Sequence, residues 1–151
     1  MIPHENHTNI LKLDIDNPSK YSEESVRAKA SELGLSIDAI TTKPSKSLGI
    51  HVFIYLRNPI SIDLVPFYES VLGSDLIRSC LINWRIRHNA YLDVFFNSVS
   101  MINMPIAMSK SVSDVIKFMK CRCPELFEKL LWFHNNDTDK LYRFISENIY
   151  E

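Results

Sequence analysis

A strong charge of either sign is missing from this chain of 151 residues, whose formal net charge is −1 at pH 7. A chain without a positive balance is no polycation, so any contact with nucleic acid must come from a local basic patch. Glycine is scarce, with three residues, and no stretch is apolar over the roughly 20 residues that a membrane-spanning helix needs. We therefore expect no membrane contact and a single domain that folds without cross-links.

Cysteine is rare as well, and its three residues are Cys80, Cys121 and Cys123. An odd number of cysteines argues against a disulfide framework, and Cys121 and Cys123 are too close in sequence for the usual zinc spacing. We therefore expect core or surface thiols and a cytoplasmic location, where thiols stay reduced.

Hydrophobic periodicity predicts an α+β fold. The predicted strands are residues 11–16, 36–42, 50–56 and 91–96. The predicted helices are residues 22–32, 63–72 and 74–88, followed by three C-terminal helices that begin near residues 112, 124 and 137. Up to residue 96 this is the βαββαβ order of a ferredoxin-like or RRM-like antiparallel sheet with helices on one face.

The domain organisation follows from this order. Residues 1–10 are expected to be a flexible N-terminus, residues 11–97 the RRM-like core, and residues 98–151 a helical extension packed on the core. Right-handed crossovers give the spatial strand order four, one, three, two. The strand at 11–16 is then central, between antiparallel neighbours at 50–56 and 91–96.

Acidic residues gather on one face of this predicted sheet. In the strand LKLDID, the alternation of side chains puts Asp14 and Asp16 on the face away from the helices. The same parity puts His51 and Asp93 there, near the starts of the two neighbouring strands, so all four should converge. Carboxylates this close repel one another unless a cation offsets them, and oxygen ligands suit Mg²⁺ or Mn²⁺.

Basic and aromatic residues are expected around these acids. Lys43 and Lys46 lie in the loop before His51, and Arg78 and Arg85 are seven residues apart on one helical face. Such groups bind phosphates, and Phe53 on the open face could stack a base. Two plainer alternatives stay open: the arginines belong to a solvated helix face, and the C-terminal helices cover the aromatic face.

Three short motifs, LKLDID, SLGIH and YLDV, resemble the three motifs of the archaeo-eukaryotic primase superfamily. The resemblance spans about residues 11–96. It implies a nucleotidyltransferase of DNA replication in which Asp14, Asp16 and Asp93 are catalytic ligands of Mg²⁺ or Mn²⁺. It further implies that His51 contacts the phosphates of a nucleotide, and that the partners are nucleotides, single-stranded DNA and other replication subunits.

Two other interpretations remain open at this point. A rolling-circle-type Rep endonuclease uses the same sheet, but it needs a His-hydrophobic-His pair, and here the strand reads His51-Val52-Phe53. A non-catalytic nucleic-acid or protein-binding module could keep the sheet and lose the chemistry. The short length of the chain favours such a module, and the intact acids argue against it.

Overall fold

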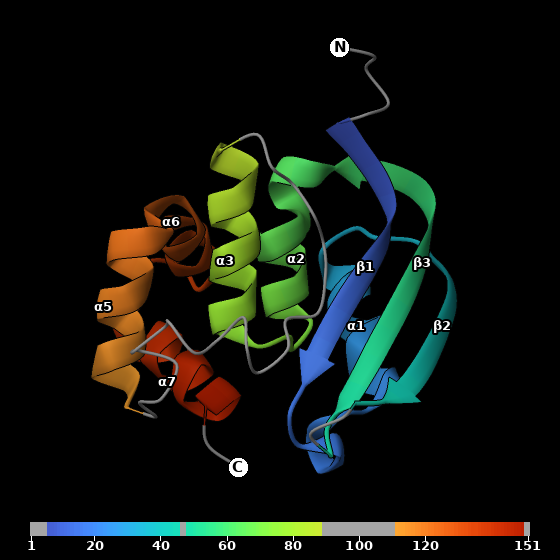
Figure 1. The fold of residues 1–151 in the computed structure, drawn as a ribbon, viewed down its shortest axis with the longest axis horizontal. Helices are drawn as coiled ribbons and strands as arrows, with labels where there is room; N and C mark the ends of the chain where they lie inside the picture. The colour runs from blue at the N-terminus through green and yellow to red at the C-terminus, as the bar shows by residue number, and fades with distance from the viewer. Residues whose placement is uncertain (1–5, 46–47, 89–110, 150–151) are drawn as a thin grey trace. The chain divides into compact units, whose positions relative to one another are not determined.

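The computed structural model of the chain (Figure 1) describes residues 6–45, 48–88 and 111–149. The backbone groups into two compact units, residues 1–75 and residues 76–151. The boundary between the two units falls between Asp75 and Leu76. No helix in the described ranges is long and apolar enough to cross a membrane.

The first unit is an antiparallel sheet with two helices. Its strands follow the order β1-β3-β2, as predicted for these three, and both pairings are antiparallel. Its elements are β1 (His7–Ile15), η2 (Pro18–Lys20), α1 (Glu23–Glu32), β2 (Ile37–Pro44), β3 (Ile50–Ser61), η3 (Ile62–Leu64) and α2 (Val65–Val71). Because β1 begins at His7, the expectation of a flexible terminus up to residue 10 is wrong for its last four residues. The fourth predicted strand, at 91–96, lies outside the described residues.

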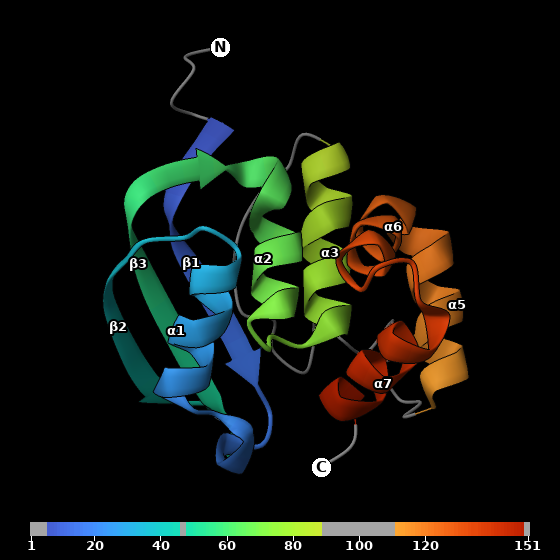
Figure 2. The ribbon, with the colours of Figure 1, turned by 180° about the vertical axis from the view of Figure 1, so that it is seen from behind.

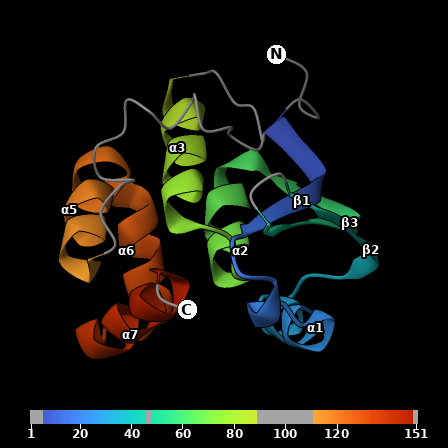
Figure 3. The ribbon, with the colours of Figure 1, turned by 60° about the horizontal axis from the view of Figure 1, so that its bottom comes forward.

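One face of the sheet forms the core of the first unit. Leu11 lies opposite Ile54 and Leu13 opposite Val52, and all four side chains are fully buried. Helix α1 lies against the sheet (Figures 2 and 3), and its buried residues are Val26 and Ala30. The alternation in β1 and β3 therefore assigns the remaining side chains of these strands to the opposite face, which we call the open face.

The ends of α1 follow the sequence signals. The Ser22 side chain accepts a hydrogen bond from the Ser25 N–H at 3.2 Å, and two glutamates occupy the first turn. Beyond the helix, Gly34 takes a φ of +76°, a left-handed conformation that glycine adopts without a steric penalty.

The outer edge of β1, away from β3, is bonded to the segment that follows α2. The Lys12 N–H donates to the Glu69 carboxylate at 2.8 Å, and the Asp14 N–H donates to the Ser74 hydroxyl at 3.0 Å. The Asp75 N–H donates to the Asp14 carbonyl at 3.0 Å. In an RRM-like sheet the fourth strand would bond to this edge, and here these backbone groups already have partners.

A tight hairpin joins β2 to β3. The Ser45 N–H donates to the Gly49 carbonyl at 2.9 Å, and the Gly49 N–H donates to the Ser45 hydroxyl at 2.9 Å. Gly49 is buried, and a Cβ on it would lie 2.6 Å from the Ile15 carbonyl oxygen. Only glycine therefore lets the start of β3 come this close to the end of β1.

In its described residues, 76–88 and 111–149, the second unit is helical. Among these residues, helix α5 contacts the other three helices, and the fully buried side chains include Ile82, Met119, Leu126, Leu130 and Leu141. Its elements are α3 (Leu76–Arg87), α5 (Val112–Arg122), α6 (Pro124–Phe133) and α7 (Thr138–Ile149). The three predicted C-terminal helices are thus confirmed, each burying an apolar stripe.

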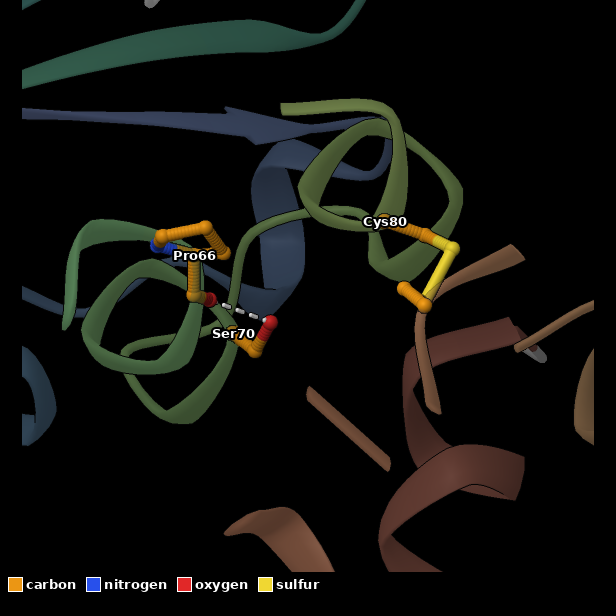
Figure 4. Close-up of a disulfide and its surroundings, with 4 residues drawn as sticks. Pro66, Ser70 and Cys80 are labelled. Atoms are coloured by element: carbon orange, nitrogen blue, oxygen red, sulfur yellow. Dashed lines mark hydrogen bonds between the residues drawn. A yellow bond between two sulfur atoms is a disulfide. The ribbon is translucent and has the colours of Figure 1, made fainter. Parts of the chain in front are cut away.

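A disulfide joins Cys80 of α3 to Cys123, the residue between α5 and α6 (Figure 4). Both cysteines are fully buried, their Cα atoms are 5.4 Å apart, and Cys121 is a free, exposed thiol. The expectation of three thiols is therefore wrong for Cys80 and Cys123, because packing brings together residues 43 positions apart in sequence. The inference of a reducing compartment loses its support with it.

We expect reduction of this disulfide to lower the free energy of unfolding of the second unit by about 2–4 kcal/mol, because the bond restricts the unfolded chain. Chemical denaturation with and without a reductant measures the loss, and Cys121→Ser is the matched control with little effect. Thiol counting in denaturant without reductant should find only the Cys121 thiol. Three reactive thiols would contradict the pairing.

We expect Gly49→Ala to destabilise the first unit by about 1–3 kcal/mol, since the added methyl group must displace the backbone of Ile15. Leu48→Ala is the control from the same hairpin, because the Leu48 side chain is 88% exposed and contributes little packing. Urea denaturation followed by circular dichroism gives both values. Equal stability of the two variants would show that the close approach does not persist in solution.

Candidate functional site

Three side chains of different charge form one row across the open face. In the pairing of the strands, Asp14 of β1 lies opposite His51 of β3, and Lys43 of β2 lies opposite His51 on its other side. The His51 Nε2 is 3.6 Å from an Asp14 carboxylate oxygen, an ion pair whenever the imidazole is protonated. Strand parity thus correctly places Asp14 beside His51.

The Asp14–His51 pair is partly withdrawn from water. The side chains are 22% and 24% exposed, respectively. Charges with little access to water interact more strongly than charges on an open surface. The Asp14 carboxylate therefore favours a cation beside it, either the imidazolium or a bound metal ion. The pair also remains reachable from solvent, as a ligand site requires.

A second row on the open face is centred on an aromatic ring. Phe53 of β3 lies between Lys12 of β1 and Thr41 of β2, two positions along the strand from His51. The Lys43 Nζ is 5.7 Å from the centre of the Phe53 ring, within the range of a cation–π contact. A half-buried ring with lysines on both neighbouring strands can stack a planar group and attract its phosphates.

Of the other two predicted acids, Asp16 alone is among the described residues. Asp16 is exposed and comes directly after the last residue of β1, so strand pairing does not fix it beside His51. Asp93, like Lys46, lies outside the described residues. Within the described ranges, no three histidine, cysteine or acidic side chains are grouped as ligands of a metal ion.

The two arginines of the predicted basic rim belong to α3 in the second unit. Arg78 is 2% exposed, so both its expected place on a phosphate-binding rim and the alternative of a solvated helix face are wrong. A guanidinium is always charged, and the helical spacing alone does not show whether its face is buried. Arg85, in the last turn of α3, is half-buried.

Sequence reasoning missed several residues that shape the site. Lys12 shares the face of Asp14 by simple alternation, but alternation alone does not place it beside Phe53. Glu69, Ser74 and Asp75, which bond to the edge of β1, carry no local signal, because their role depends on how α2 packs beside β1. Gly49 lies in the SLGIH motif, and nothing in that motif predicts its close approach to Ile15.

Comparisons with known proteins identify no relative of this chain. No family model, no curated protein and no solved structure matches the chain. The functional interpretation therefore depends on the residues of the open face and on the chemistry that they can support.

We expect Asp14→Asn to shift the titration of the His51 imidazole to lower pH, because the carboxylate 3.6 Å away stabilises its protonated form. Proton NMR of the histidine rings against pH measures the shift, with the His51 signal assigned from its loss in His51→Asn. Asp38→Asn, which removes an exposed acid from β2, is the control. An unchanged His51 titration in Asp14→Asn would show that the pair is absent in solution.

Proposed function

We propose that the chain is a nucleic-acid replication protein whose open face binds a nucleotide or single-stranded DNA at a primase-like divalent-metal site. The observation that supports this proposal is the row of Asp14, His51 and Lys43 across the three strands, next to the Phe53 ring. A carboxylate, an imidazole, an ammonium group and an aromatic ring are together the groups that a metal-bound nucleotide requires.

Each group has a distinct role in this proposal. The carboxylates of Asp14, Asp16 and Asp93 would hold Mg²⁺ or Mn²⁺, and the metal would supply the positive charge that phosphates need for nucleotidyl transfer. His51, protonated beside Asp14, donates a hydrogen bond to a phosphate oxygen. Lys43 and Lys46 attract the phosphate chain, and Phe53 stacks the base.

The proposal includes a fourth strand at 91–96 that completes an RRM-like sheet and brings Asp93 to the site. The bonds that Lys12 and Asp14 already make on the outer edge of β1 constrain this strand. It would have to pair with β1 outside this stretch, or Asp93 would have to approach from elsewhere.

Binding of a labelled single-stranded oligonucleotide, followed by fluorescence anisotropy with and without Mn²⁺, tests the proposal. We expect Mn²⁺ to strengthen binding to the wild type, and Asp14→Asn to abolish this effect. Phe53→Ala should weaken binding by about 1–3 kcal/mol if a base stacks on the ring. Lys43→Gln should flatten the dependence of log K on log salt by about one unit, because one phosphate contact is lost.

The matched control for Lys43→Gln is Lys117→Gln, which removes an exposed lysine from α5 in the second unit. It should leave both the affinity and the salt dependence unchanged. Binding that depends on salt but not on Mn²⁺ or Asp14 would replace the metal site with a non-catalytic binding module. No binding to oligonucleotides or nucleotides at low salt would overturn the proposal altogether.

A further inference from the structure

The backbone of Asp14 is held on both sides. Its neighbours in sequence, Leu13 and Ile15, pair with β3, while its own N–H and carbonyl point to the outer edge and bond to Ser74 and Asp75. Two residues earlier, the Lys12 N–H bonds to Glu69, whose side chain is fully buried. The segment after α2 thus takes the place of a neighbouring strand at the residues that carry the open-face charges.

Ser74 is itself placed by the way α2 ends. Gly73 takes a φ of +114°, and the Ser74 N–H then donates to the Glu69 carbonyl at 2.9 Å, the bond that closes a Schellman motif. Ser74 is fully buried. Its hydroxyl is therefore presented to Asp14 by a rigid helix end and not by a free loop.

We propose that Ser74 is a positioning residue for the Asp14–His51 pair. Its hydroxyl accepts the Asp14 N–H, fixes the peptide on that side of Asp14, and thereby sets the direction in which the carboxylate projects toward His51. Without this acceptor, the Asp14 N–H loses a partly buried hydrogen bond, and the edge of β1 relaxes away from β3. The carboxylate then spends less time beside the imidazole.

Ser70 offers a closely matched control for this role. Like Ser74, it is a fully buried serine at the end of α2, but its hydroxyl donates to the Pro66 carbonyl at 2.7 Å, within the same helix (Figure 4). Replacing either serine with alanine removes one hydrogen bond of its hydroxyl group. Only the replacement of Ser74 removes a hydrogen bond to the edge of β1.

The experiment compares Ser74→Ala, Ser74→Thr and Ser70→Ala by NMR titration of His51, with thermal unfolding as a separate measure of stability. We expect Ser74→Ala to move the His51 titration to lower pH, part of the way to the value in Asp14→Asn. Ser74→Thr keeps the hydroxyl and should restore the wild-type titration. Ser70→Ala should lose stability without moving the titration, since it does not touch β1.

A wild-type His51 titration in a folded Ser74→Ala protein would overturn the proposal, because Ser74 would then be structural only. An equal shift in Ser70→Ala would overturn it too, since any loss of stability would then move His51. Should Ser74→Ala fail to fold, Ser74→Thr and Ser74→Gly decide, since only threonine keeps an acceptor for the Asp14 N–H.

The relevance of Ser74 to ligand binding, unlike its effect on the pair, rests on the proposed function. Broadening of the His51 signal by Mn²⁺ separates the two. If Mn²⁺ broadens His51 in the wild type and less in Ser74→Ala, the positioning extends to the metal site. If Mn²⁺ leaves the wild-type signal unchanged, the proposed metal site fails, and the titration alone still decides the role of Ser74.

Discussion

The antiparallel register of β1 against β3 is the constraint on which the rest of the first unit depends. Pairing Leu13 with Val52 buries one face of the sheet, and the same pairing sets Asp14 opposite His51 on the other. A slip by one residue would bury the carboxylate and expose the leucines, at a cost that includes both the lost apolar burial and an unpaired buried charge. The core therefore fixes the geometry of the site.

What could be predicted from the sequence is what alternation and capping encode. The alternation of side chains along a strand predicted which residues of β1 and β3 share a face, and so placed Asp14 near His51. The capping residue Ser22 and the left-handed Gly34 mark the two ends of α1. Arg78 was misplaced because helical spacing shows which residues share a face but not which face is buried. The Cys80–Cys123 bond was missed because a count of cysteines carries no information about packing.

The outer edge of β1 shows a different limit of sequence reasoning. The order of predicted elements favoured an RRM-like sheet in which a strand covers the outer edge of β1. In the structure, the polar groups of that edge at Lys12 and Asp14 are satisfied by a carboxylate, a hydroxyl and a backbone amide from the end of α2. Backbone groups must be paired when they are buried, but nothing in a strand's own sequence says whether a strand or a helix end will pair them.

This arrangement has a consequence for how a charged site can be built at the edge of a small sheet. An edge strand that meets water frays, and a carboxylate carried on it would have no fixed direction. Here Gly49 holds one end of β3 against Ile15, and the end of α2 holds the outer edge of β1, so Asp14 is fixed from two sides. The open face can then remain polar and partly exposed. Asp14 is held rigidly by backbone hydrogen bonds and by the buried core on the opposite face of the sheet, and its own side chain does not have to be buried.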